Sequence, residues 1–202
     1  MVDPSLRAFL DESSARRDNG QQIYLVCAAM LPAERCEALR EHLRPLLLPG
    51  QIKLHWTAES ERRRKSIVSR ILELGPLNVV VSHVDEHRKK TERYRRKCLE
   101  TLYYALSDEE VFDLTLESRD RKQDGNGRAH IVNLQGQGLD RRLRIRHQRG
   151  GDEPLLWIAD AVLGAINADH RGVSDHLEAL RETIYLDMCT PGSARLQADE
   201  RP

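Results

Sequence analysis

The sequence lacks the long hydrophobic runs of a membrane protein. Its longest apolar stretch, residues 154–166, contains thirteen residues and one charge, whereas a spanning helix needs ~20 uninterrupted apolar residues. The first fourteen residues, MVDPSLRAFLDESS, contain no basic leader, no long apolar core and no small-residue cleavage site. We therefore expect a cytoplasmic protein that does not associate with membranes.

Cysteine patterns and nucleotide-binding glycine motifs are also missing. The four cysteines contain no CxxC pair and no Cys/His ladder, which excludes a recognisable zinc site or disulfide framework. No GxGxxG or GxxxxGK[ST] run lies at a strand-to-helix turn, so dinucleotide and P-loop chemistry have no support.

Net charge of one sign is absent as well, because 32 Lys and Arg balance 32 Asp and Glu. A neutral chain does not coat nucleic acid by bulk charge. The charges are nevertheless uneven, since residues 141–149 contain five arginines and no acid. This cluster indicates either a local basic surface or the solvated face of a hairpin, and charge alone does not decide between them.

What the chain does contain is an alternation of strand and helix patterns. We expect strands at residues 6–10, 23–30, 77–84, 111–116 and 143–146, and helices at 33–43, from a Thr57 cap to Gly75, around 94–105, at 154–168 and at 177–185. Residues 120–127 are predicted to form a polar loop. The alternation indicates an α/β fold with a mixed sheet, because the opening hairpin is antiparallel. We expect one domain over residues 1–190 and a polar tail over 191–202.

Three carboxylates stand out by position. Asp11 lies at the end of the first predicted strand, and Glu117 lies at the end of the predicted penultimate strand. Asp160 is the only charged residue in the apolar stretch 154–166. Burying such a carboxylate costs several kcal/mol unless a cation, a metal or hydrogen-bond donors meet it. We therefore expect Asp160 to have a specific partner.

Acids at two strand ends and on a late helix are a pattern typical of metal-ion phosphodiester hydrolysis. Two hard cations about 4 Å apart need oxygen ligands, and Mg²⁺ or Mn²⁺ fits that requirement. Each acid also has an ordinary interpretation: Asp11 as a turn carboxylate, Glu117 as an exposed strand acid paired with Arg119, and Asp160 as a buried ion pair.

Four short motifs occur in order along most of the chain: AFLDES (residues 8–13), LHW (54–56), LESR (116–119) and LLWIADAVLGAIN (155–167). Together they resemble those of a known family, the domain of unknown function 3800, which is regarded as RNase H-like. The resemblance implies an RNase H-like mixed sheet flanked by helices, with Asp11, Glu117 and Asp160 as metal ligands. Two departures are a helix after the second strand and Ser14 where the family commonly has glycine.

Other side chains are secondary candidates. Glu12 is expected to point to the sheet face opposite Asp11, and His55 is a candidate for proton transfer or a packed core residue. Phosphate contacts are predicted for Lys53, Arg119 and the arginine cluster Arg141, Arg142, Arg144 and Arg146. The leading hypothesis is a metal-dependent nuclease. The alternative is a non-catalytic nucleic-acid-binding or regulatory protein, and RNA and DNA remain equally open as partners.

Overall fold

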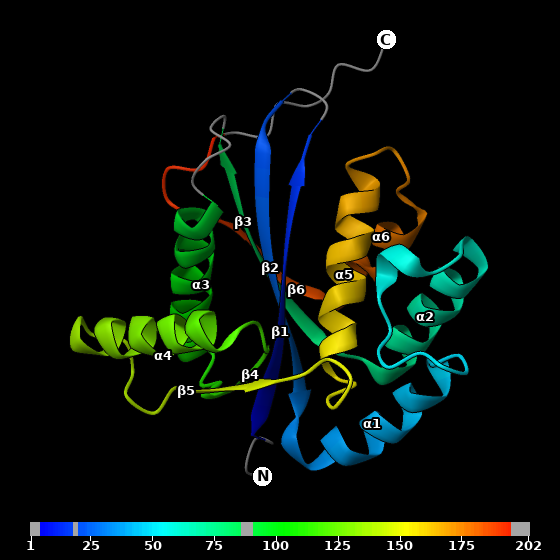
Figure 1. Ribbon diagram of the computed structural model, residues 1–202, viewed down its shortest axis with the longest axis horizontal. Coiled ribbons are helices and arrows are strands. Elements are labelled where there is room, and N and C mark those ends of the chain that lie inside the picture. The colour runs from blue at the N-terminus through cyan, green and yellow to red at the C-terminus, as the bar shows by residue number, and fades with distance from the viewer. Residues whose placement is uncertain (1–4, 18–19, 86–90, 195–202) are drawn as a thin grey trace.

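The computed structural model describes residues 5–17, 20–85 and 91–194. Its centre is one mixed six-stranded sheet with the order β5-β4-β1-β2-β3-β6, covered by helices on both faces (Figure 1). The strands are β1 (Leu6–Arg16), β2 (Gln22–Pro32), β3 (Leu77–Asp85), β4 (Asp113–Glu117), β5 (Arg144–Gln148) and β6 (Ile184–Cys189). Among the described residues, no helix is long and apolar enough to cross a membrane.

Strand directions confirm the predicted α/β class. β1, β2 and β3 are antiparallel neighbours in succession, β4 lies parallel to β1, β5 lies parallel to β4, and β6 lies parallel to β3. This succession of three antiparallel strands is the opening that the resemblance in sequence implies. The helices between β2 and β3 separate these strands in sequence, but the two strands still pair with each other.

Each sheet face carries its own helical layer (Figure 1). One face is covered by α1 (Cys36–Leu43), α2 (Glu61–Leu74), α5 (Leu156–Asp169) and α6 (Asp175–Leu180), and the other by α3 (Thr91–Asp108) and α4 (Arg121–Gly136). Side chains alternate along β1, so Phe9 packs in the α5 layer while Ala8 and Leu10 pack in the α3 layer. Both faces of the sheet are therefore buried.

Several predicted boundaries are wrong. β1 continues to Arg16 because the polar DESSAR run pairs with β2, so Asp11 lies within the strand. The predicted loop at 120–127 is helical, since the Asp120 carboxylate accepts a hydrogen bond from the Gln123 backbone N–H and caps α4. The helix α2 ends at Leu74, before Gly75 as predicted, but it begins at Glu61 after Ser60, not at Thr57.

The segment of residues 175–189 differs most from its predicted secondary structure. The α-helix in this region is α6 (Asp175–Leu180), so only residues 177–180 of the predicted helix at 177–185 are α-helical, and Ile184–Cys189 forms the sixth strand beside β3. Half-buried and exposed residues alternate along β6, as expected of an edge strand. Glu117 therefore ends the fourth of six strands.

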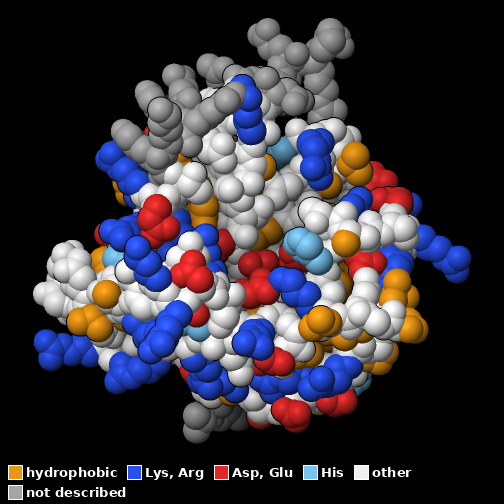
Figure 2. All heavy atoms as spheres, viewed as in Figure 1, with side chains coloured by type: hydrophobic (Ala, Val, Ile, Leu, Met, Phe, Trp, Pro, Cys, Tyr) orange, Lys and Arg blue, Asp and Glu red, His pale blue; other side chains and the backbone are white. Residues whose placement is uncertain are grey.

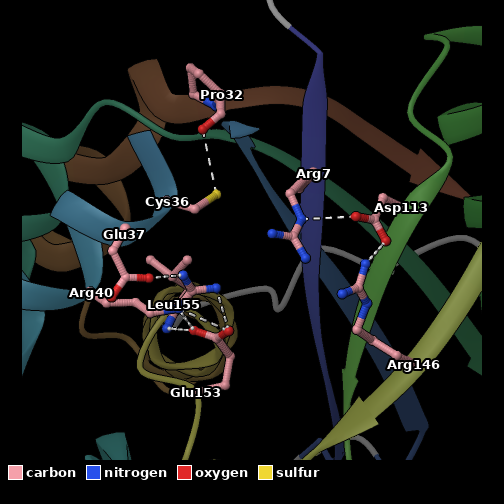
Figure 3. A network of polar contacts seen from close by, with 9 residues as sticks. All are labelled: Arg7, Pro32, Cys36, Glu37, Arg40, Asp113, Arg146, Glu153 and Leu155. Atoms are coloured by element: carbon pink, nitrogen blue, oxygen red, sulfur yellow. Dashed lines mark hydrogen bonds and ion pairs between the residues drawn. The ribbon is translucent and has the colours of Figure 1, made fainter. Parts of the chain in front are cut away.

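The start of α5 is held by a buried ion pair (Figure 3). Glu153, only 2% exposed, accepts hydrogen bonds from Arg40 Nε at 2.9 Å and Nη2 at 2.8 Å, and from the Leu155 N–H at 3.1 Å. A buried carboxylate with three donors is compensated for its lost hydration. This pairing fixes the apolar helix against α1.

The middle of α5 meets Trp56 at a glycine. A Cβ placed on Gly164 would lie 2.2 Å from Trp56 Cδ1 and Cγ, which is far inside van der Waals contact. The buried indole therefore rests directly on the α5 backbone. This close packing fixes the backbone of the segment that contains Lys53 and His55 beside the helix.

Gly164→Ala is expected to destabilise the protein by more than about 2 kcal/mol, because the added methyl overpacks a rigid ring. The matched control is Gly136→Ala, since Gly136 is also helical and a Cβ there meets nothing within 4 Å. The control should be neutral or slightly stabilising. Urea unfolding monitored by tryptophan fluorescence measures both, and equal effects would contradict the close-packing argument.

Candidate active site

A cleft opens where β4 stops pairing with β1. The parallel register runs from Arg7–Asp113 to Leu10–Leu116, and beyond it β1 continues with β2 alone on its other side. Asp11 and Glu117 are the next residues of the two strands. Ligand sites of open sheets lie at such carboxyl ends of parallel strands, where the chain order reverses.

The alternation of side chains directs the acids to one face. Asp11 has the same orientation as Phe9, and Glu117 has the orientation opposite to the buried Leu116 of the α3 layer, so both face α5. Asp160 projects from α5 itself, and all three carboxylates line one cleft of about 360 Å³. Figure 2 shows the molecular surface in the view of Figure 1, with acidic side chains in a hollow near its centre, beside basic ones.

Asp160 has the partners that its burial requires. Its Oδ2 accepts a hydrogen bond from the Trp56 backbone N–H at 2.7 Å, and its Oδ1 lies 3.1 Å from His55 Nδ1. Burial raises the pKa of Asp160, while the Trp56 N–H and the His55 ring oppose that rise. Asp160 is thus oriented by the LHW segment, and no arginine is paired with it among the described residues.

Glu117 is paired with a lysine. Lys53 Nζ donates to Glu117 Oε1 at 2.6 Å. Burial lowers the pKa of Lys53, but the hydrogen bond and charge of Glu117, together with the charges of Asp11 and Asp160, raise it overall. A Cβ on Gly150 would lie 2.5 Å from Glu117 Oε1, so the turn after β5 closes directly over this pair.

Asp11 bears the largest electrostatic cost. Burial, followed by the charges of Asp160 and Glu117, raises the pKa of Asp11 to about 8. The Glu12 backbone N–H at 2.8 Å and the charge of Lys53 offset only part of this. Three carboxylates with one ammonium group leave an excess of negative charge, which is the condition that favours a bound cation.

The donor set fits a hard divalent ion in its chemistry. Carboxylate oxygens are the ligands that Mg²⁺ and Mn²⁺ prefer, and Asp11, Glu117 and Asp160 supply them from three elements. Within the described part of the chain, no three His, Cys, Asp or Glu side chains are already grouped closely enough to hold a metal. Lys53 supplies the positive charge at Glu117 in this conformation.

Glu12 and Arg119 lie on the other side of β1. Glu12 points to the opposite face, where it accepts hydrogen bonds from Arg95 Nε at 2.7 Å and Nη2 at 2.9 Å and from the Tyr24 hydroxyl. Arg119 lines this second cavity of about 300 Å³ together with Glu12 and Arg95. The two cavities share residues 11–14 and Glu117.

The predicted arginine cluster lies away from the acids. Arg146 is paired with Asp113, which also binds Arg7 across three strands (Figure 3), and Arg142 is paired with Asp140 at 2.8 Å. Arg141 and Arg144 are exposed near the edge strand β5. None of Arg141, Arg142, Arg144 and Arg146 lines the acidic cleft.

Sequence reasoning overlooked the far half of the cleft. Its lining includes Ser13, Arg16, Arg17, Asn167, His170 and Arg171. One available signal was helical spacing, because Asn167 lies seven residues after Asp160 and therefore on the same side of α5. Arg16 and Arg17 were not predicted to line the cleft, because the first strand was predicted to end at Leu10.

Neither a family model nor a curated protein matches this sequence, so the similarity to the domain of unknown function 3800 stays a resemblance. Among solved structures, the chain is similar to the PCNA:RNase HII complex from Archaeoglobus fulgidus, with a TM-score of 0.49, 15% identity, and coverage of 96% of this chain and 98% of that chain. It is also similar to ribonuclease H2 from Pyrococcus horikoshii OT3, with a TM-score of 0.47, 13% identity, and coverage of 88% of this chain and 76% of that chain. The similarity to Bst-RNase HIII in complex with Mn²⁺ has a TM-score of 0.43, 11% identity, and coverage of 90% of this chain and 55% of that chain.

Asp11→Asn is expected to stabilise the metal-free protein increasingly as pH rises. The native carboxyl holds its proton up to about pH 8, whereas the unfolded one ionises near its ordinary pKa. Wild type therefore loses stability between about pH 4 and 8, and the asparagine variant avoids that part of the loss. Melting temperatures in EDTA at pH 5, 6.5 and 8 measure the widening gap.

The control for this series is Glu178→Gln, an exposed carboxylate on α6. Its melting temperature should differ from wild type by a small and constant amount. A gap between Asp11→Asn and wild type that stays constant or narrows toward pH 8 would show that Asp11 is not an unfavourably buried carboxylate.

Proposed function

We propose that this protein is a divalent-metal-dependent nuclease that hydrolyses phosphodiester bonds of nucleic acid. Asp11, Glu117 and Asp160 would hold one or two Mg²⁺ or Mn²⁺ ions. The observation that carries the proposal is the meeting of these three acids, from widely separated segments, in one cleft where the parallel pairing of β1 and β4 ends.

Bound ions would lower the pKa of a water molecule and neutralise charge on the leaving oxygen. The chain itself performs the orientation. The Trp56 N–H fixes Asp160, the pairing of β1 with β4 fixes the positions of Asp11 and Glu117, and the close turn at Gly150 covers the Glu117 side chain. Phosphodiester hydrolysis joins a water oxygen to phosphorus, breaks a phosphorus–oxygen ester bond and protonates the leaving oxygen.

His55 is the candidate for proton transfer. Its ring is about half exposed and lines the cleft. When Nδ1–H donates to the Asp160 carboxylate, Nε2 is left to accept or release a proton. Arg119 is the candidate for positioning phosphate from the adjacent cavity, which shares Glu117 with the cleft.

The non-catalytic alternative finds less support in the contacts. It assigns nucleic acid to residues 141–149, yet Arg142 and Arg146 are already neutralised by Asp140 and Asp113. A purely structural role for Asp160 would call for a buried cation, whereas its partners are a backbone N–H and a half-exposed histidine.

Asp11→Asn and Asp160→Asn should each lower Mn²⁺-dependent cleavage at least 100-fold, because each removes a charged ligand. Labelled single- and double-stranded RNA and DNA are incubated with each purified protein and Mn²⁺, and the products are separated by electrophoresis. Glu178→Gln serves as the matched acid-to-amide control and should retain wild-type activity. Equal trace activity in wild type and both asparagine variants would refute the catalytic proposal.

Lys53→Met is expected to bind Mn²⁺ about tenfold more tightly than wild type, a difference of about 1.4 kcal/mol. The ammonium group of Lys53 and the divalent ion compete for the Glu117 carboxylate. Isothermal titration calorimetry without nucleic acid measures this affinity. Lys65→Met, which removes an exposed lysine on α2, should leave it unchanged. Weaker Mn²⁺ binding by Lys53→Met would contradict the competition.

A further inference from the structure

The cleft extends well beyond the three acids. Its floor follows the second half of β1, and its wall follows α5 from Asp160 to Asn167 and ends at Arg171, in the turn after the helix. Halfway along, Asn167 Nδ2 donates to Ser13 Oγ at 2.9 Å. The strand and the helix therefore run side by side from the acids to the far end.

Charge reverses along this cleft. The acids Asp11, Glu117 and Asp160 lie at one end, and the lining residues of the other end include Arg16, Arg17, His170 and Arg171. Arg16 and Arg171 are exposed. Among the described lining residues, the basic end contributes no carboxylate. Exposed arginines on either side of one groove form a typical contact for phosphate oxygens.

The middle of the cleft is lined by polar side chains. Asn167 Oδ1 is buried and has no hydrogen-bond partner among the described residues, although Nδ2 of the same amide is bonded to Ser13. Buried polar atoms without partners are uncommon in native proteins. The polar lining of Ser13 and Asn167 is therefore suited to a hydrated or hydrogen-bonding molecule, such as a nucleic-acid backbone.

The two charged ends are separated by a consistent length. Five residues of extended β1 from Asp11 to Arg16 span about 16 Å. The nine residues from Asp160 to the end of α5 at Asp169 span about 14 Å, and Arg171 follows two residues later. One strand of stacked nucleic acid advances about 3.4 Å per nucleotide. The basic end therefore lies about five stacked nucleotides from the acids, and fewer if the strand is extended.

We propose that the second half of the cleft binds the phosphodiester backbone of one nucleic-acid strand, with Arg16 and Arg171 contacting a phosphate about five nucleotides from the bond at the acids. This inference rests on the proposed function. A cleft of about 360 Å³, at the small end of ligand pockets, admits one backbone. Trp56 is its only described aromatic ring of the Phe, Tyr or Trp type and is buried, so no ring is available for base stacking.

Fluorescence anisotropy in EDTA tests this site without turnover. Labelled single-stranded RNA and DNA of 3, 6 and 12 nucleotides are titrated against wild type, Arg16→Ala/Arg171→Ala, and the control Arg141→Ala/Arg144→Ala. Both double variants remove two exposed arginines, so they change the net charge equally. Wild type should bind the 6-mer at least tenfold more tightly than the 3-mer.

In Arg16→Ala/Arg171→Ala, that length dependence should disappear, and the slope of log Kd against log salt should fall by about 0.7, because one phosphate contact on a single strand is lost. The control should stay within twofold of wild type. Three results would overturn the site. They are an equal loss of oligonucleotide affinity in both double variants, a loss of affinity in the control only, and a length dependence that persists in Arg16→Ala/Arg171→Ala.

The same titrations separate this site from the catalytic proposal. If the length dependence behaves as expected while Mn²⁺ yields no cleavage, the strand site stands and the nuclease proposal fails. If Mn²⁺-dependent cleavage is present and Arg16→Ala/Arg171→Ala binds every oligonucleotide as wild type does, the nuclease proposal stands and the strand site is wrong. An absence of nucleic-acid binding by wild type would overturn the strand site.

Discussion

The point at which β4 stops pairing with β1 determines the rest of this site. While the two strands are paired, their alternating side chains pack into the hydrophobic layers on the two faces of the sheet. Immediately after Leu10 and Leu116, the same alternation points Asp11 and Glu117 toward α5. Pairing with β2 keeps β1 extended for six more residues. One strand therefore supplies both a carboxylate at the acidic end and an arginine at the basic end of a single cleft.

Charge crowding in this cleft is costly to the folded protein. A carboxylate whose pKa rises to about 8 is held against its own tendency to ionise, and the close glycine contacts at Gly150 and Gly164 leave little room to relieve the crowding. Strongly perturbed carboxylates in a cleft are a common property of functional sites, although ion-pair networks can also produce them. Here the partners of Glu117 and Asp160 come from the short segment of residues 53–56, and the charge of Lys53 in that segment also acts on Asp11.

Prediction from sequence succeeded where a physical signal was local. The α/β class followed from alternating strand and helix patterns, and Asp160 was recognisable because a single charge in an apolar helix requires a partner. Its actual partners, a backbone N–H and His55, lie more than one hundred residues away in sequence, and no local pattern encodes that contact. The extension of β1 was missed because DESSAR is polar. Only its pairing with β2 makes it a strand, and for the same reason the basic end of the cleft went unnoticed. The sixth strand was missed because the pairing of β6 with β3 decides its conformation.

Diffraction from crystals soaked in MnCl₂, recorded near the manganese absorption edge, tests the central claim most directly. The account predicts an anomalous peak within coordination distance, about 2.1 to 2.2 Å, of oxygens from Asp11, Glu117 and Asp160, with the Lys53 ammonium displaced from Glu117. A peak at other residues only, or no peak while Lys53 remains bonded to Glu117, would contradict it.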